Sequence, residues 1–295
     1  MDNPLIRIGT RGSDLALWQA NHVKSQLESL GCSVEISIIQ TQGDRIQDLS
    51  FDKLEGKGFF TKEIEAELLK GTVDLAVHSH KDLETTPPPG LIIAAVSDRE
   101  DPSELLLIRA EAHDPTQKFE LKQGATVGTS SARRQSLLRC FRADLILEEL
   151  RGNVPTRIDK LRAGHYDAIL LAKAGVSRLT LDVSDLIALT LNPKEFIPAP
   201  AQGVLGLQVR EHDEHTNQWV RKLNVSQAEH CISVERAVLS SMEGGCQLPL
   251  GVYNDGAVVH VAYAKSKDQA AVIIKFPIEN TVNPVPEIVA TLRTL

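Results

Sequence analysis

The alternation of short apolar runs with amphipathic stretches is the feature of this 295-residue chain that most constrains its fold. Through the first two thirds, runs rich in β-branched residues are followed by stretches with helical periodicity. This pattern predicts an α/β protein with largely parallel sheets. The runs that we expect to form strands are Leu5–Gly9, Val34–Gln40, Asp74–Val77, Leu91–Val96, Glu104–Ile108, Thr126–Gly128, Leu145–Leu147, Ala168–Leu171 and Val204–Val209.

The first helix has the clearest limits of any expected element. Ser13 is a side chain that caps helix N-termini well, and Gly31 is suited to end the helix. Between them, apolar residues recur at intervals of four and three, which places them on one face of a helix. These residues are Ala16, Ala20, Val23, Leu27 and Leu30.

The periodic pattern is interrupted by charge or proline at Asp98–Ser103 and again at Phe196–Gly203. These breaks predict two crossings between lobes. Residues 1–98 and 203–221 would form one discontinuous lobe, and residues 103–197 would form the other. The strand after the second crossing would then return to the first lobe.

A third unit is expected over residues 222–295. Ser226 and Glu229 have the spacing of a capping box, and the helix that they start runs to about Met242. Alternating strands follow, which predicts a small α+β domain.

Composition excludes several classes of protein. The formal charge of −7 argues against a surface built broadly for nucleic acid, so an anionic ligand must be met by clustered arginines. No run of about 18 apolar residues occurs, and the start lacks the basic and apolar regions of a secretion signal. We therefore expect a cytoplasmic protein that binds neither membrane nor nucleic acid. A monomer is expected as well, separately from the composition.

The four cysteines give no sign of a metal or redox motif. No C-x-x-C pair occurs among them, so neither a zinc knuckle nor a redox centre is indicated. Reduced thiols are the default in the cytoplasm. They are Cys32, Cys140, Cys231 and Cys246, of which Cys140 and Cys231 fall within expected helices as buried fillers.

Three expected strand-to-helix turns carry arginine, where exposed backbone N–H groups and the helix dipole already favour anions. Each arginine taken singly could be a solvated surface charge. Together, on an acidic protein, they predict a cleft for a ligand with several carboxylates or phosphates, which arginine binds in bidentate fashion. The turns are Thr10-Arg11-Gly12-Ser13, Gly128–Arg134 and Arg151–Arg157.

The segment Asp74–Asp82 ends an apolar run with polar side chains. His78 and His80 would share one face of an extended strand, but no third or fourth ligand stands at a suitable spacing, so we predict no metal site. Asp82 has two interpretations that the residues leave open. It could balance a cation that develops on a substrate, or it could cap a helix or turn.

Two glycine-rich segments indicate accessible loops. Glu55–Phe60 precedes a helix that Thr61 could cap, and it fits a mobile flap or an ordinary flexible loop. It lacks the spacing of a phosphate-binding Walker loop. Glu243–Gln247 exposes Cys246 at the end of a helix, where the dipole does not stabilise a thiolate. This cysteine therefore needs a reactive electrophile as its partner.

At this point the chain resembles the porphobilinogen deaminase family over essentially its whole length. The matching blocks stand in the family's order, which makes chance similarity untenable. They are Ile8–Ser13 with Leu15–Ala20, Gly56–Phe60, Ala76–Ser79, Lys81-Asp82, Arg99–Pro102, Gly128–Ser131, Arg133–Gln135, Leu150–Val154, Tyr166–Ile169, Gln202-Gly203 and Glu243–Cys246.

The resemblance implies two lobes like type II periplasmic binding proteins, with parallel-rich mixed sheets, plus a small C-terminal domain that carries the cofactor. A dipyrromethane cofactor would be attached by a thioether to Cys246. Four porphobilinogen molecules would lose ammonia, condense head to tail on this cofactor and be released by hydrolysis as hydroxymethylbilane. The enzyme would be a transferase of tetrapyrrole biosynthesis.

The resemblance also assigns roles to residues of this chain. Asp82 would stabilise the cationic intermediate, and Lys57 and Phe60 would belong to the flap. The residues that would bind or lie beside the carboxylates of cofactor and substrate are Arg11, Ser13, Lys81, Thr129, Ser131, Arg133, Arg134, Arg151, Arg157, Arg178 and Gln202. The chain departs from the family where Pro200-Ala201 precede Gln202, since Val-Gly is frequent there.

Two other classes of protein are compatible with the fold alone. One is a binding or regulatory module that closes on a carboxylate ligand without chemistry, and the other is a transferase that uses a metal. A binder would need neither Asp82 nor Cys246. Metal analysis of the purified protein would distinguish a metal-dependent transferase from the other classes.

Overall fold

The computed structural model describes residues 3–41, 61–245, 247–278 and 283–295. The chain divides into two compact units, of which the first comprises Met1–Glu100 and Gln202–His230 and the second Asp101–Ala201 and Cys231–Leu295. The first two boundaries between the units, at Glu100/Asp101 and at Ala201/Gln202, lie inside the segments where charge and proline break the sequence pattern.

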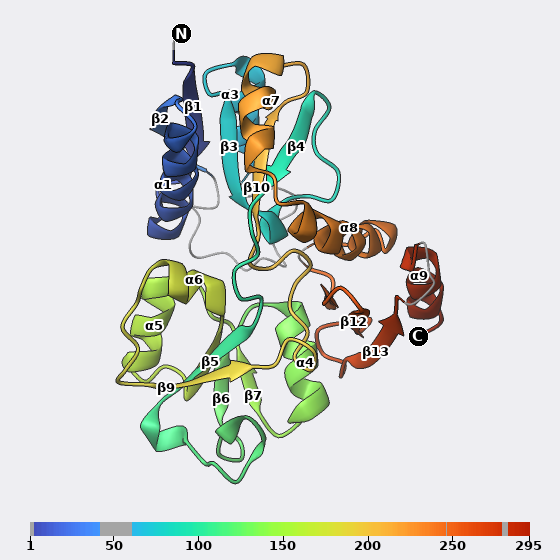
Figure 1. Cartoon of the computed structure of the whole chain (residues 1–295). Coiled ribbons are helices and arrows are strands. Elements are labelled where there is room, and N and C mark those ends of the chain that lie inside the picture. The colour runs from blue at the N-terminus through green and yellow to red at the C-terminus, as the bar shows by residue number, and fades with distance from the viewer. Residues whose placement is uncertain (1–2, 42–60, 246, 279–282) are drawn as a thin grey trace. The chain divides into compact units, whose positions relative to one another are not determined.

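The first unit is built on a five-stranded mixed sheet with the order β2-β1-β3-β10-β4. Strand β1 runs parallel to β2 and β3, whereas β10 runs antiparallel to β3 and β4. The elements of this unit, seen in Figure 1, are β1 (Leu5–Thr10), α1 (Asp14–Ser29), β2 (Ser33–Ile38), α3 (Lys62–Lys70), β3 (Leu75–Ser79), the 3₁₀ helix η2 (His80–Asp82), β4 (Leu91–Val96), β10 (Leu205–Arg210), α7 (Glu214–Val220) and η5 (Arg221–Leu223).

Helices cover both faces of this sheet because its inner strands are apolar on both sides. On one face, Val23 and Leu27 of α1 pack with Leu207 of β10 in a core that Trp219 of α7 also joins. On the other face, Ile64 and Leu68 of α3 form a smaller core.

The second unit holds a sheet of the same design, with the order β7-β6-β8-β5-β9. Strand β6 runs parallel to β7 and β8, and β5 runs antiparallel to β8 and β9. Its elements are β5 (Glu104–Ile108), η3 (Ala110–Ala112), η4 (Lys118–Glu120), β6 (Thr126–Gly128), α4 (Ala132–Phe141), β7 (Ile146–Glu148), α5 (Val154–Arg162), β8 (Ala168–Ala172), α6 (Lys173–Arg178) and β9 (Ile187–Leu191).

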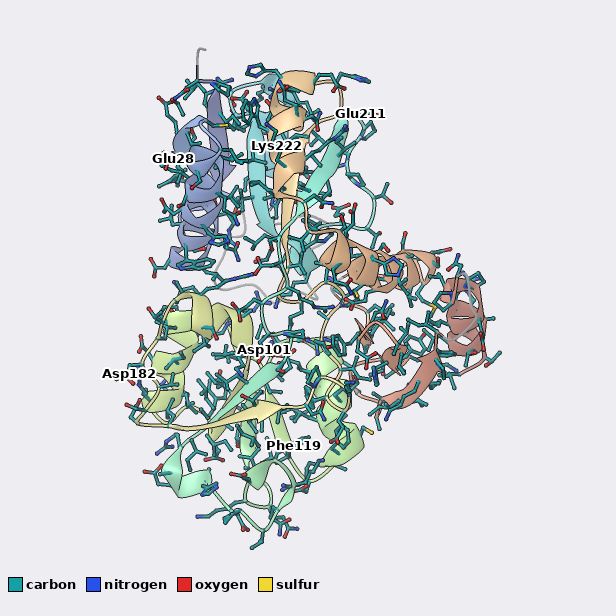
Figure 2. The ribbon with its side chains drawn as sticks, viewed as in Figure 1. Glu28, Asp101, Phe119, Asp182, Glu211 and Lys222 are labelled. Carbon is teal, nitrogen blue, oxygen red and sulfur yellow. The ribbon has the colours of Figure 1, made fainter. Side chains whose placement is uncertain are left out.

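Alternate residues of β5 serve two cores, which explains why the run Glu104–Ile108 is apolar without interruption after its first residue. Leu106 and Ile108 pack with α4 on one face, and Leu105 and Leu107 pack with α5 and α6 on the other. Asp101, labelled in Figure 2, lies just before this strand, and its carboxylate pairs with Lys173 Nζ at 2.8 Å.

The C-terminal part of the second unit contains an antiparallel sheet, β11-β12-β13. Helices α8 and α9 pack against it through Val238, Leu239, Ile288 and Leu292. The bounds are α8 (Ser226–Ser241), β11 (Leu250–Asn254), β12 (Val258–Tyr263), β13 (Val272–Pro277) and α9 (Val285–Thr294). In the described ranges, no helix combines the length and apolar character needed to cross a bilayer.

The predicted fold class is confirmed, with two mixed α/β sheets and a small antiparallel C-terminal sheet. All nine predicted strands form, each within two residues of the expected bounds at either end. Strand β9 was not predicted. It is an edge strand whose first four residues alternate between half-buried and exposed positions and whose last residue, Leu191, is buried.

The first helix begins as predicted, because the Ser13 hydroxyl accepts a hydrogen bond from the Ala16 N–H at 3.4 Å. Its end differs slightly. Leu30 is the C-cap and is 38% exposed instead of joining the buried stripe, and Gly31 follows with φ +93°.

Two local predictions need correction. Ser226 is the first residue of α8 and not its cap, since the Glu229 N–H bonds to the carbonyl of Val225. Cys140 does lie on a helix, but on its exposed side, whereas Cys231 is buried as expected.

The backbone at the second break in the pattern is unusual. Ala201 has φ +61°, a left-handed conformation that side chains disfavour. Gly203 has φ +93°, and a β-carbon there would overlap the carbonyl oxygen of Glu100. The Glu100 N–H in turn donates to the Gly203 carbonyl at 3.2 Å. Glycine is therefore required at 203 for two independent reasons.

Gly203→Ala should destabilise the protein by about 2 to 5 kcal/mol, because left-handed strain adds to a clash with backbone. Gly124→Ala is the matched control. Gly124 also has positive φ, at +72°, but a β-carbon at this position would have no neighbour within 4 Å, so about 1 to 2 kcal/mol is expected. The stabilities of the two variants are compared by urea denaturation, with near-UV circular dichroism as the signal. Equal shifts of the two midpoints would contradict the close approach to Glu100.

Candidate active site

The three arginine-bearing turns lead into helices α1, α4 and α5, and each helix is capped by a side chain of its turn. The Ser131 hydroxyl accepts from the Arg134 N–H at 3.4 Å, and the Asn153 side-chain oxygen Oδ1 accepts from the Thr156 N–H at 2.9 Å. Ser13 does the same for α1. The remaining N–H groups of each first turn and the helix dipole make these positions suitable for anions.

In the first unit, the end of β3 and the segment before β10 bring two predicted residues together. Lys81 Nζ donates to Gln202 Oε1 at 3.2 Å, and Gln202 is only 1% exposed. Arg99 Nε donates to the Gln202 carbonyl at 3.0 Å. The backbone of His80 also bonds to Val204, so the two segments are joined along their length.

The turn that carries Arg11 and Ser13 is tied to the same strand end. Gln19 of α1 is buried, and its Nε2 donates to Ser79 Oγ at 2.8 Å. Arg11 and Ser13 are half-buried in the turn before this helix. The N-terminus of α1 is thereby fixed relative to Lys81, two residues beyond Ser79.

Asp82 ends the 3₁₀ helix η2 and is exposed. Its carboxylate makes no hydrogen bond or ion pair with any residue that the structure describes. A capping carboxylate would accept a bond from a nearby backbone N–H. The described contacts therefore lend no support to the cap interpretation.

His78 and His80 do not form the pair expected on one strand face. His78 lies within β3, but His80 follows the end of the strand and begins η2. Within the described ranges, no cluster of three or more His, Cys, Asp or Glu side chains is arranged to hold a metal ion.

His78 instead belongs to a buried polar chain that the sequence did not reveal. Its Nε2 lies 3.1 Å from Gln208 Oε1, and Gln208 Nε2 donates to Glu65 Oε1 at 3.0 Å. Burial lowers the pKa of His78 to about 4, against a smaller opposing effect of the Gln208 bond. Burial likewise raises the pKa of Glu65. The chain joins β3, β10 and α3 beneath the strand end that leads to Asp82.

In the second unit, the two arginine turns after β6 and β7 are joined by Ser130. Its hydroxyl donates to the Leu150 carbonyl at 2.9 Å and accepts from the Leu150 N–H at 3.0 Å. Thr129 is buried, and its Oγ1 accepts from the Ser131 N–H at 3.3 Å. The N-termini of α4 and α5 are thus held next to each other.

Arg133 and Arg134 are both nine-tenths buried and both bind Glu104. Arg133 Nη2 donates to Glu104 Oε1, and Arg134 Nη2 donates to Glu104 Oε2, each at 2.6 Å. Glu104 has no exposed surface. Sequence reasoning missed this carboxylate, although a charged residue at the head of the apolar run that became β5 was a visible signal.

The other predicted arginines of this unit are half-buried. Arg157 Nε donates to the Gly152 carbonyl at 2.7 Å, and Arg151 Nε lies 3.8 Å from a carboxylate oxygen of Glu149. Arg178 is the last residue of α6. These side chains are accessible in part, unlike Arg133 and Arg134.

Three predicted residues lie outside the described residues: Lys57, Phe60 and Cys246. The residues before Cys246 are described as far as Gly245. Helix α8 ends at Ser241, and Glu243 has φ +54°.

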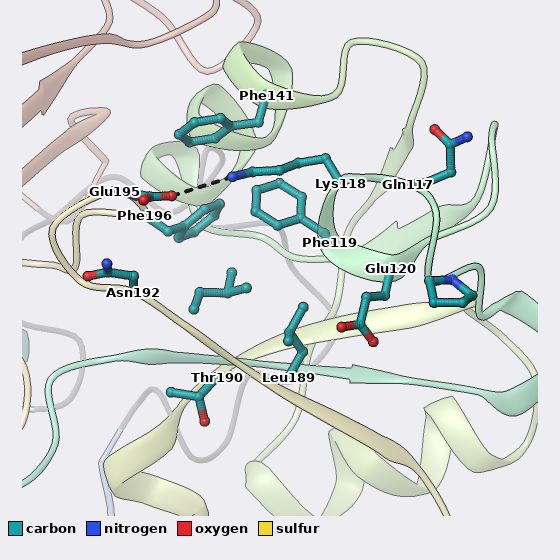
Figure 3. A pocket seen from close by; sticks show the side chains of 12 residues that line it. Gln117, Lys118, Phe119, Glu120, Phe141, Leu189, Thr190, Asn192, Glu195 and Phe196 are labelled. Atoms are coloured by element: carbon teal, nitrogen blue, oxygen red, sulfur yellow. Dashed lines mark hydrogen bonds and ion pairs between the residues drawn. The ribbon is translucent and has the colours of Figure 1, made fainter.

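The second unit also has a cavity of about 340 Å³ away from the predicted site residues. Figure 3 shows its wall of Phe119, Phe141 and Phe196, with Lys118 Nζ reaching Glu195 across 3.4 Å. None of the predicted binding residues lines it. This cavity and the strand-to-helix turns are therefore separate features of the second unit.

Two protein-family models match this chain. Residues 6–218 match the model described as "Porphobilinogen deaminase, dipyromethane cofactor binding domain". Residues 229–269 match the model described as "Porphobilinogen deaminase, C-terminal domain". Together they span most of the chain.

A curated relative agrees with these models. The porphobilinogen deaminase of Sulfurimonas denitrificans is 43% identical over 247 residues, which are 83% of this chain and 77% of the relative.

Solved structures give weaker likenesses. The periplasmic VFT2 domain of Bordetella pertussis BvgS has a TM-score of 0.45 at 14% identity, covering 79% of this chain and 94% of that one. An arginine-specific periplasmic binding protein of Salmonella typhimurium has a TM-score of 0.42 at 12% identity, covering 75% and 91%. At these scores we draw no conclusion from them.

His78 should make stability depend on pH between about 6.5 and 4. Its folded-state pKa of about 4 lies below the usual 6.5, so in this range the unfolded chain binds a proton that the folded chain does not. Stability is therefore fully present above pH 6.5 and falls by about 3 kcal/mol as pH drops to 4.

His78→Gln removes the titrating group, so urea unfolding between pH 7 and 4 should show a shallower loss of stability than in wild type. His212→Gln is the control, because the His212 side chain is 91% exposed. Identical pH profiles of wild type and His78→Gln would show that His78 is not held neutral by burial.

Proposed function

The chain belongs to the porphobilinogen deaminase family, and from this premise we propose how its own residues perform the reaction. It is a hydroxymethylbilane synthase, a transferase that condenses four porphobilinogen molecules head to tail with release of ammonia. The observation that carries this assignment is the match of two family models, together with 43% identity to a curated relative. A dipyrromethane cofactor, when bound, supplies the pyrrole carbon to which the first substrate unit is joined.

Cys246 is the residue that we propose as the attachment point of the cofactor. It follows two glycines in the sequence and lies within the family's Glu-Gly-Gly-Cys block. The sulfur of Cys246 would replace the amino group on the methylene carbon of a porphobilinogen-derived unit, so that a sulfur–carbon bond forms, the carbon–nitrogen bond breaks, and ammonia leaves with the thiol proton.

The residues present fit a cofactor that carries several carboxylates. Arg133 and Arg134 share one carboxylate, so this buried group has one positive charge in excess. It lies at the N-terminus of α4, where the dipole also favours an anion. An anionic ligand would offset both the excess positive charge and the positive end of the α4 dipole.

We therefore propose that the carboxylates of cofactor and substrate are bound by two sets of side chains. In the first unit these are Arg11, Ser13, Lys81 and Gln202. In the second they are Thr129, Ser131, Arg133, Arg134, Arg151, Arg157 and Arg178. Arginine suits this task because its planar fork binds a carboxylate through two parallel hydrogen bonds and stays charged.

Asp82 is proposed as the catalytic carboxylate. Loss of ammonia leaves positive charge on the substrate ring, and a fixed carboxylate beside the ring nitrogen stabilises that charge more than it stabilises the neutral ground state. The exposed position of Asp82 at the end of η2 supports access to a ligand. The turn that contains Asp82 is closed by the bond from the Leu83 N–H to the His80 carbonyl.

Further properties complete the proposal. Lys57 and Phe60 would belong to a flap, and the protein would be cytoplasmic and monomeric. Three domains are proposed, formed by residues 1–98 with 203–221, by residues 103–197 and by residues 222–295.

Protein expressed with the pathway intact should weigh more than its sequence by one dipyrromethane. Cys246→Ala should remove this extra mass, because no other thiol stands in the attachment motif. Cys140→Ala is the control and should keep it, although Cys140 is an exposed cysteine. Intact-protein mass spectrometry measures both. Active wild-type protein of unmodified mass would refute the attachment.

Asp82→Asn should keep the fold and the covalent cofactor but slow ammonia release by about 10²–10³, since asparagine conserves size and removes charge. The readout is single-turnover ammonia release on cofactor-loaded protein, with a thermal melt beside it. Asp268→Asn, whose side chain is 72% exposed in wild type, should leave both unchanged. If Asp82→Asn releases ammonia at the wild-type rate, the carboxylate is structural.

A further inference from the structure

Glu104 is the shared acceptor of two consecutive arginines on α4. Residues i and i+1 of a helix point about 100° apart, so Arg133 and Arg134 would ordinarily diverge. Here both guanidinium groups reach the same carboxylate, one on each oxygen, at 2.6 Å. Glu104 is therefore the group that makes them converge.

Each arginine is also fixed by a backbone carbonyl. Arg133 Nη1 donates to the Ile197 carbonyl, and Arg134 Nη1 donates to the Leu170 carbonyl, both at 2.9 Å. One terminal nitrogen of each guanidinium thus binds Glu104 and the other binds backbone. Two anchors of this kind fix the plane of a guanidinium as well as its position.

The cluster of Arg133, Arg134 and Glu104 has more donors than acceptors and more positive than negative charge. Two guanidiniums and one carboxylate leave a net charge of +1, with side-chain exposures of 6%, 8% and 0%. Arg134 Nε is buried and bonds to no acceptor among the described residues. Excess buried charge and an unused donor are costly unless a further anion is bound.

We propose that Glu104 is a positioning residue that orients Arg133 and Arg134 for binding the carboxylates of cofactor and substrate. This inference rests on the proposed function of the two arginines. Glu104 itself touches no ligand. It acts by holding two like charges in one place and by fixing the direction from which a ligand carboxylate completes the cluster.

The first experiment compares Glu104→Gln with Glu195→Gln in the full chain. The amide matches the carboxylate in size but cannot neutralise charge or accept on both arms, so the two guanidiniums should separate. KM for porphobilinogen should rise by roughly one to two decades, or the cofactor-loaded fraction should fall, with a smaller change in kcat of the loaded protein. Glu195, whose side chain is 58% exposed, should show neither effect.

A second variant covers the case in which Glu104→Gln fails to fold. Glu104→Asp keeps the charge but is one methylene shorter, so it can reach one guanidinium and not both. It should fold with a melting temperature below that of wild type, because one buried guanidinium loses its partner, and show a KM between those of wild type and Arg134→Lys. Glu104→Asp with wild-type loading and KM would overturn the proposal.

Double variants separate a positioning role from a structural one. If Glu104 acts through Arg134, the effects of Glu104→Asp and Arg134→Lys on KM should combine to less than their product. Independent effects that multiply would overturn the positioning role. If Arg133→Lys and Arg134→Lys both load cofactor and bind substrate like wild type, then the proposed function of these arginines fails, and the role of Glu104 fails with it.

Discussion

Both five-stranded sheets are completed by an antiparallel strand that enters directly after a break in the sequence pattern. Strand β10 bonds to β3 and β4, and β5 bonds to β8 and β9, so each sheet would split without this strand. In the first unit, the end of β3, which leads to Lys81 and Asp82, is paired directly with β10.

The same two strands also carry the buried polar groups beneath the proposed binding residues. Glu104 begins β5 and orders Arg133 and Arg134, and Gln208 of β10 joins His78 to Glu65. A buried polar group is costly unless it is hydrogen-bonded, so each fixes its neighbours once the strand is in place. Sheet pairing and site geometry are therefore coupled through strands that are apolar in most other positions.

Much of the fold could be predicted because it depends on local pattern, whereas the buried contacts could not. The cap at Ser13 and the strand Leu91–Val96 follow from residue types close together in the chain. Glu104 and Gln208 find their partners 29 and 143 residues away, at Arg133 and Glu65, and no local pattern encodes such pairs. For the same reason His78 was considered only as a metal ligand, when its actual neighbour comes from β10.

Burial divides the proposed arginines into two physical classes with different consequences for binding. Arg133 and Arg134 are fixed by Glu104 and by backbone, so binding a carboxylate costs them little further side-chain entropy. Arg151 and Arg157 are half-buried and retain contact with water, which screens their charge but lets them follow a ligand. A product that gains carboxylates with every unit added presents new positions at each step. The fixed pair, Arg133 and Arg134, suits a carboxylate that occupies the same position at every step. The half-buried arginines suit carboxylates whose positions change as units are added.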